Sequence, residues 1–218
     1  MSWLLALDTT AAVGSLALLS DGELVEEVVL QCPDGFADVI FGAIEALLAR
    51  HELAVPDIDC FAGATGPGSF TGVRVGLTVV KGLGDAAERP VVGVSNLAAM
   101  ASFGNAPLRA VVLDARRGEI YAALYDSELR IVQPETVIRL ADWLVGLPSS
   151  DVEFVAFDFA PFGDVLRGYP MVEAPRALAR AVGAIAWREF AARRAVDAAA
   201  LDANYVRRSD AEILWKEM

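Results

Sequence analysis

Short apolar runs separated by turn residues open the chain. Residues 4–7 form an apolar run, a second predicted strand at 15–19 is apolar after Ser15, and a third predicted strand, 23–30, follows the turn Ser20-Asp21-Gly22. Apolar runs of this length bounded by turn signals are typical of β-strands joined as hairpins. The pattern therefore predicts an antiparallel three-stranded meander at the start of the chain.

A helical period then replaces the short runs. Within 37–50 the apolar residues recur every three to four positions, which predicts an amphipathic helix. The same reading gives further strands and helices in alternation, the strands at 58–65 and 91–94 and the helices at 71–83 and 97–102. Strands that alternate with helices indicate an α/β lobe.

The order of elements repeats in the second half. An apolar run at 110–113 ends at Asp114, as the run at 4–7 ends at Asp8, and an offset of 106 residues aligns the two aspartates. The second half continues with predicted strands at 119–125, 129–132 and 152–157, and with predicted helices at 138–144 and 177–195. We therefore expect two related α/β lobes, 1–104 and 105–218, with the C-terminal tail packing back on the first lobe.

Composition and charge narrow the class of protein. The 218 residues are 55% hydrophobic with a net charge of −12, so we expect a large core and weak binding of this chain alone to tRNA. The alternative is that the negative charge only keeps the protein in solution and says nothing about its partners. Two cysteines without a CxxC pattern, and no membrane-spanning run or signal peptide, lead us to expect a cytoplasmic protein.

Residues 66–76 form a glycine-rich segment after a predicted strand. Gly66-Pro67-Gly68 predicts a tight turn, and Ser69 or Thr71 can cap the helix that follows. No Gly-Lys-Ser/Thr follows, so the segment is not a P-loop. Gly72 and Gly76 share one helix face, which indicates close packing against the lobe's own sheet or against a helix of another chain.

Several segments, taken in order along the chain, resemble the motifs of the TsaB family. They are 5–9, 66–76, 93–97, 114–121 and 205–212. The element order resembles that of the actin, sugar-kinase and Hsp70 superfamily. The resemblance implies an α/β fold of two actin-like (ASKHA, ribonuclease H-like) lobes, each a mixed sheet flanked by helices.

The resemblance also implies a role without catalysis. TsaB binds the catalytic subunit TsaD, works with the ATPase TsaE and self-associates through helices of its N-terminal lobe. The complex transfers a threonylcarbamoyl group to N6 of adenosine 37 in tRNAs that decode ANN codons. We accordingly expect no strongly bound cofactor, ATP use by the complex rather than by this chain, and tRNA contact only through the complex.

Two groups of residues are candidates for function. The first, a partner-binding surface on two helices, comprises Val39, Ile40, Phe41, Ile44, Leu47, Leu48, Gly72, Val73, Gly76, Leu77 and Val80. The second, a nucleotide or phosphate site, comprises Asp8, Thr9, Thr10, Gly68, Ser69, Asp114 and Arg116. The alternatives are that the helices lie under the second lobe, and that Asp8 and Asp114 only end strands and cap turns.

Two enzymatic functions are alternatives to the non-catalytic role. A metallopeptidase-like enzyme of this superfamily needs a His-x-x-x-His pair, but His51 is the single histidine, and Phe36 stands where many family members have a histidine. A superfamily kinase needs a small, glycine-containing phosphate loop in each lobe. Here Asp8-Thr9-Thr10 lacks the glycine, and the loop after Asp114 carries Arg116 and Arg117.

Overall fold

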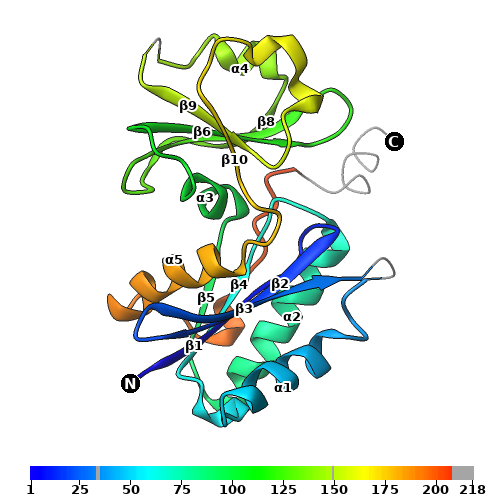
Figure 1. Cartoon of the computed structure of the whole chain (residues 1–218), viewed down its shortest axis with the longest axis vertical. Coiled ribbons are helices and arrows are strands. Elements are labelled where there is room, and N and C mark those ends of the chain that lie inside the picture. Colours follow the sequence, from blue (N-terminus) through cyan, green and yellow to red (C-terminus); the bar gives the residue numbers. More distant parts are fainter. Residues whose placement is uncertain (33–34, 149, 208–218) are drawn as a thin grey trace. The chain divides into compact units, whose positions relative to one another are not determined.

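The computed structural model describes residues 1–32, 35–148 and 150–207, and the chain forms two compact units (Figure 1). The first unit contains residues 1–99 together with 176–203, and the second contains 100–175 and, of the described tail, 204–207. The division after residue 99 lies five residues before the expected boundary at 104, and the segment 176–203 packs on the first sheet and so belongs to the first unit. No helix among the described residues has the length and apolar character needed to cross a membrane.

The first unit is built on a five-stranded mixed sheet. Its strands are β1 (Trp3–Asp8), β2 (Val13–Ser20), β3 (Glu23–Gln31), β4 (Cys60–Ala64) and β5 (Val91–Val94), in the order β3-β2-β1-β4-β5. The β1–β2–β3 meander is antiparallel, whereas β4 pairs parallel with β1 and β5 pairs parallel with β4. The antiparallel meander confirms the prediction from the apolar runs.

Helices cover both faces of this sheet, as Figure 1 shows. They are α1 (Ile40–Arg50), α2 (Phe70–Ala87) and α5 (Ala179–Ala191), with short 3-10 turns at η1 (Val55–Asp57) and η3 (Ala198–Ala200). The short helix α3 (Asn96–Ala101) follows β5. Alternate residues of β1 and β2 face α1 and α2 in one core, which includes Leu5, Leu16 and Ile40. The opposite face meets α5, where a Cβ on Gly183 would lie 2.4 Å from the Leu19 side chain. Burial on both faces explains why β1 is almost wholly apolar.

The second unit repeats the sheet. Its strands are β6 (Leu108–Asp114), β7 (Ile120–Asp126), β8 (Ile131–Ile138), β9 (Val152–Ala156) and β10 (Met171–Glu173), in the order β10-β9-β6-β7-β8. Helix α4 (Leu140–Leu144) and the 3-10 segment η2 (Ala160–Leu166) supply aromatic side chains to one face. The Trp143 and Phe154 rings meet edge to face with centroids 6.4 Å apart. The matching strand orders confirm the predicted duplication.

Some predicted elements have different bounds or types. The predicted helix 138–144 begins two residues later, because β8 continues through Ile138. The strand predicted at 129–132 is therefore longer and begins at Ile131, and the sequence reading missed β10. The tail beyond residue 207, expected to pack on the first lobe, lies outside the described residues. Its described start, from 204 to 207, belongs to the second unit, which differs from that expectation.

Candidate functional site

The loop that follows β1 is closed by its own hydrogen bonds. Asp8, Thr9 and Thr10 are 1%, 1% and 4% exposed. The Asp8 Oδ1 atom accepts hydrogen bonds from the Thr10 N–H at 2.9 Å and from the Thr10 hydroxyl at 2.6 Å. Asn96 donates to Thr10 Oγ1 at 2.6 Å and accepts from the Gly66 N–H at 2.9 Å. The network therefore joins the loops at the carboxyl ends of β1, β4 and β5.

Burial changes the acid chemistry of Asp8. Loss of solvent raises the pKa of this carboxyl above its ordinary value, and the hydrogen bonds from Thr10 oppose the rise only in part. Within the described part of the chain, Asp8 Oδ2 has no hydrogen-bond partner. The carboxyl therefore takes up a proton more readily than a solvated aspartate, which weakens it as a ligand for a divalent cation.

The glycines of the 66–76 segment allow α2 to lie directly on this loop. A Cβ on Gly72 would lie 2.0 Å from the Thr9 carbonyl oxygen, and one on Gly76 would lie 2.5 Å from Thr9 Oγ1. A Cβ on Gly68 would lie 2.6 Å from the Thr10 carbonyl oxygen. The Thr9 hydroxyl in turn donates to the Gly72 carbonyl at 2.7 Å. The close neighbour that the sequence analysis sought in the lobe's own sheet or in another chain is the loop between β1 and β2 of the same lobe.

Anions commonly bind to the free N–H groups at helix N-termini. At two helices of the first unit, these N–H groups donate instead to side-chain oxygens of the protein itself. At α2 the Ser69 hydroxyl accepts from the Gly72 N–H at 3.3 Å. At α5 the Ala179 N–H donates to Ser15 Oγ at 2.9 Å, and the Arg180 N–H donates to Glu27 Oε1 at 3.0 Å. The Glu27 carboxylate also places negative charge at this end of α5, where a phosphate would be repelled.

The matching loop of the second unit has an unusual backbone. Asp114 Oδ1 accepts from the Arg116 N–H at 2.7 Å. Arg116, Arg117 and Gly118 follow with φ values of +63°, +58° and +76°. Left-handed backbone costs about 1–2 kcal/mol at a residue other than glycine. The Arg116 side chain is exposed, and the Asp114 carboxylate accepts a hydrogen bond within the turn.

Arg207 reaches the inner side of this second loop, which the sequence did not predict. Its guanidinium donates to the Ala115 carbonyl at 2.8 Å and to the Glu119 carboxylate, and lies 5.9 Å from the centre of the Tyr121 ring. The sequence analysis instead expected the C-terminal tail to pack on the first lobe. The described start of the tail, including Arg207, belongs to the second unit.

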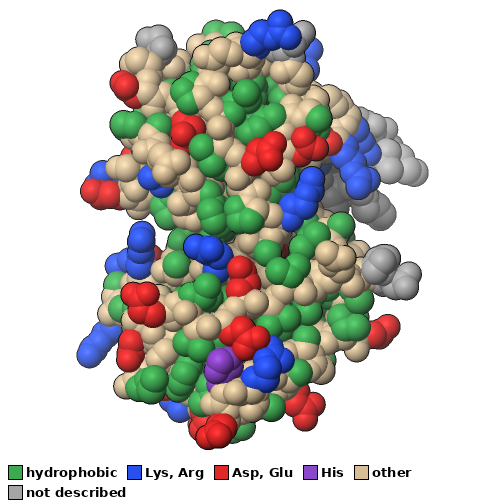
Figure 2. Space-filling model, in the orientation of Figure 1, with side chains coloured by type: hydrophobic (Ala, Val, Ile, Leu, Met, Phe, Trp, Pro, Cys, Tyr) green, Lys and Arg blue, Asp and Glu red, His purple; other side chains and the backbone are tan. Residues whose placement is uncertain are grey.

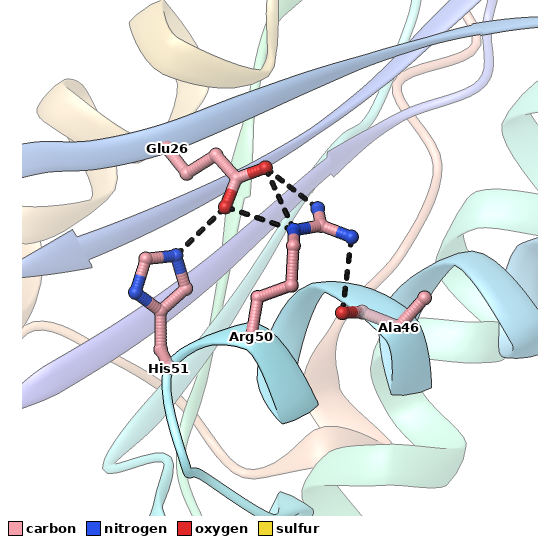
Figure 3. A network of polar contacts seen from close by, with 4 residues as sticks. All are labelled: Glu26, Ala46, Arg50 and His51. Atoms are coloured by element: carbon pink, nitrogen blue, oxygen red, sulfur yellow. Dashed lines mark hydrogen bonds and ion pairs between the residues drawn. The ribbon is translucent and has the colours of Figure 1, made fainter.

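His51 lies in an ion-pair network at the end of α1 (Figure 3). Its Nε2 lies 2.7 Å from Glu26 Oε2, and the Arg50 guanidinium lies 2.6 Å from Glu26 Oε1. Arg50 and, to a smaller extent, His51 hold the pKa of Glu26 below its ordinary value. The histidine therefore ties α1 to β3, and the described residues contain no group of three His, Cys, Asp or Glu side chains placed to bind a metal.

The predicted partner-binding residues separate into buried and exposed groups. Those buried in the core of their own unit are Ile40, Ile44, Leu47, Leu48, Gly72, Val73, Gly76, Leu77 and Val80. Val39 and Phe41 remain 38% and 59% exposed. On α2 the Arg74 guanidinium stacks 3.9 Å above the centroid of the Phe70 ring, which is also exposed.

Comparison with known proteins identifies the family of this chain. The family model of TsaD, tRNA N6-adenosine threonylcarbamoyltransferase, matches residues 33–164. The tRNA threonylcarbamoyladenosine biosynthesis protein TsaB of Bacillus subtilis (strain 168) is 31% identical over 227 residues, which cover 98% of each chain. The chain belongs to the TsaB family.

Solved structures agree with this membership. The structure of YeaZ from Pseudomonas aeruginosa matches with a TM-score of 0.78 at 30% identity, over 94% of this TsaB-family chain and 100% of that chain. Component A of (R)-2-hydroxyglutaryl-CoA dehydratase from Acidaminococcus fermentans shares the fold alone, with a TM-score of 0.55 at 10% identity over 88% of this chain and 100% of that chain. The predicted class of two actin-like lobes is thus confirmed, and TsaB membership indicates a role in tRNA threonylcarbamoyladenosine biosynthesis.

Proposed function

We propose that this chain is a non-catalytic subunit that binds the catalytic threonylcarbamoyltransferase TsaD and supports it together with TsaE. The observation that carries the non-catalytic role is the closed loop after β1, where Asp8, Thr9 and Thr10 are at most 4% exposed and make their hydrogen bonds within the lobe. A kinase of this superfamily would need these groups open to phosphate. ATP is accordingly used by the complex, and this chain needs no cofactor of its own.

The outer face of α1 is the proposed binding surface for TsaD and, in the isolated chain, for a second copy. Phe41 is exposed there, beside small side chains at Gly42 and Ala46 that allow a partner to approach closely. Nothing lies within 4 Å of a Cβ built on Gly42, so its own lobe does not require that glycine. A glycine inside a helix is about 1 kcal/mol less favourable than alanine, and a partner helix packed against Gly42 accounts for it.

The surface is tested by exchanging Phe41 for arginine. Aromatic residues at the centre of an interface dominate its binding energy, so Phe41→Arg is expected to weaken binding to TsaD by at least about tenfold. Val29→Arg is the matched control, because Val29 is an exposed apolar residue of the same unit on β3. Calorimetric titration with TsaD measures both, and equal affinities for the two variants would exclude α1 from the interface.

The proposal also predicts that the chain alone modifies no tRNA and that Mg-ATP calorimetry detects no tight binding. Tight ATP binding with hydrolysis by the purified chain would favour the kinase alternative. A stoichiometric metal in elemental analysis would favour the metallopeptidase-like one.

A further inference from the structure

The outer edge of the first sheet is partly closed by the chain itself. On β5, the Val91 N–H donates to the Val196 carbonyl at 2.8 Å, and the Val91 carbonyl accepts from the Val196 N–H at 2.9 Å. The two residues form an antiparallel bridge, so an extended residue beyond α5 pairs with this edge. The outward N–H and C=O groups of an edge strand bind another strand in this way.

Strand β10 is the counterpart of β5 in the second sheet. Each is the last strand of its sheet and pairs parallel with the strand beside it, β4 or β9. Each also follows a proline whose carbonyl accepts a hydrogen bond from that neighbour, Pro90 from the Phe61 N–H at 3.2 Å and Pro170 from the Phe154 N–H at 2.8 Å. Met171, which follows Pro170, is therefore the counterpart of the first residue of β5, whose outward groups are bonded in the first unit.

The pairing with β9 directs the main chain of Met171 and Glu173 away from the sheet. The Pro170 carbonyl accepts from β9, and the Ala174 N–H donates to the Ala156 carbonyl of β9 at 2.8 Å. Main-chain groups alternate between the two sides of a strand, so those of Met171 and Glu173 point to the outer edge. Within the described residues, these outward N–H and C=O groups have no hydrogen-bond partner.

The side chains at this edge are apolar and acidic. Val165, Tyr169 and Met171 are 51%, 38% and 49% exposed. The Tyr169 ring lies edge to face on the ring of Phe154, the ladder partner of Met171, with centroids 4.9 Å apart. The Glu173 side chain is exposed and makes no hydrogen bond or ion pair with any described residue. Figure 2 shows hydrophobic and acidic side chains together on the surface over the elements that Figure 1 labels α4, β6 and β9.

We propose that the outer edge of β10 binds an extended segment of a partner protein, which pairs antiparallel with Met171 and carries a basic residue beside Glu173. This inference rests on the proposed function, which gives the chain protein partners. Strand addition to an open edge uses main-chain hydrogen bonds for affinity and side chains for specificity. In the first unit the residue that pairs with the corresponding position is Val196, which is β-branched and antiparallel, so a segment of this kind fits the edge of β10.

Charge selects among the occupants of the edge. The net charge of −12 and the unpaired Glu173 carboxylate favour a basic segment and repel a nucleic-acid backbone. A second copy of the chain is the less suitable occupant, because it brings the same carboxylate and the same net charge to the edge. It would also offer only a three-residue strand for pairing, shorter than the usual five or six residues.

Amide hydrogen exchange tests the pairing directly. In the isolated chain, the outward amides of Met171 and Glu173 are expected to exchange rapidly, whereas the bonded Ala174 amide exchanges slowly. When TsaD, and then TsaE, is added, exchange at Met171 and Glu173 is expected to slow by at least about tenfold. Mass spectrometry with residue-level fragmentation measures each amide. Unchanged exchange in the complete complex overturns the inference, and so does protection that depends only on the concentration of the isolated chain, because a second copy then covers the edge.

Two substitutions at Met171 separate main-chain pairing from side-chain contact. Met171→Pro removes the outward N–H, and proline is tolerated where the N–H of an edge strand faces solvent. Met171→Val keeps the N–H, the apolar character and a high strand preference. Calorimetric titration uses the protein whose addition slows the exchange. Affinity is expected to fall by at least about tenfold for Met171→Pro, because the partner's acceptor is left unpaired, and to be unchanged for Met171→Val. Equal affinities for the two variants overturn the inference.

A charge reversal keeps the test independent of how the proline variant folds. Glu173→Lys is expected to weaken the same binding, whereas Glu128→Lys, at an exposed glutamate of the same unit, is the control and leaves it unchanged. Equal affinities for these two variants contradict the proposed basic residue beside Glu173. Melting temperatures of all variants are compared with wild type first.

Co-elution of the wild-type chain with TsaD separates this inference from the proposed function. If the wild-type chain fails to co-elute, the proposed function itself fails. If it co-elutes and exchange at Met171 and Glu173 is unchanged with TsaD and TsaE present, the proposed function stands and the inference about β10 alone is overturned. Slower exchange together with weaker binding by Met171→Pro supports the inference.

Discussion

Replacing Gly72 by alanine tests whether α2 packs on the β1–β2 loop. The added Cβ would lie 2.0 Å from the Thr9 carbonyl oxygen and 3.0 Å from the Thr9 carbonyl carbon, so helix or loop must move. Overpacking of this kind costs about 1–3 kcal/mol, and disturbing the bond from the Thr9 hydroxyl to the Gly72 carbonyl adds about 1 kcal/mol. Alanine regains about 1 kcal/mol of helix propensity. The expected net loss is about 2 kcal/mol, which lowers the melting temperature by about 4–8 °C.

Gly82→Ala is the matched control on the same helix. Gly82 is exposed, and nothing lies within 4 Å of a Cβ built there, so alanine gains helix propensity without a clash. Its melting temperature is expected to rise by about 2–4 °C. Circular dichroism at 222 nm (the usual helix band) during heating measures both variants. Equal stabilisation by the two substitutions would refute the packing argument.

Two further predictions concern titrating groups. The pKa of Asp8 lies above the ordinary value of 3.8 in the folded chain, so the stability linked to its neutral form is complete below that value and is lost as pH rises through the folded pKa. Asp8→Asn is therefore expected to gain melting temperature relative to wild type as pH rises, and parallel pH profiles would contradict this. Burial raises the pKa of the Cys60 thiol to about 12, so iodoacetamide should label the partly exposed Cys32 in the native chain and leave Cys60 unlabelled until unfolding. Mass spectrometry of the labelled peptides decides this, and rapid native labelling of Cys60 would contradict its burial.

The duplicated sheet was predictable because its signals are local. Apolar runs, turn residues and the shared positions of Asp8 and Asp114 each lie within a few residues of the element that they define. The place of α5 was not predictable in this way. Its sequence follows the second sheet, but its glycine at 183 and its first N–H groups find their partners on β1, β2 and β3, more than 150 residues earlier.

The candidate site was predicted in part for the same reason. The sequence showed that Gly72 and Gly76 require a close neighbour but not that the neighbour is Thr9, because that contact joins segments 63 residues apart. The apolar periodicity correctly predicted that α1 is a helix. It could not distinguish the residues buried in the lobe's own core from Phe41, which remains exposed. The fold is needed to separate the two.

Reconstitution with and without this chain tests the central claim most directly. Purified TsaD, TsaE, an ANN-decoding tRNA, threonine, bicarbonate and ATP, together with an enzyme that forms the threonylcarbamoyl adenylate, are incubated, and the modified adenosine is quantified by mass spectrometry of digested tRNA. The account predicts modification only when the chain is present, and none from the chain without TsaD. Full modification in its absence, or modification by the chain without TsaD, would contradict its role as a supporting subunit.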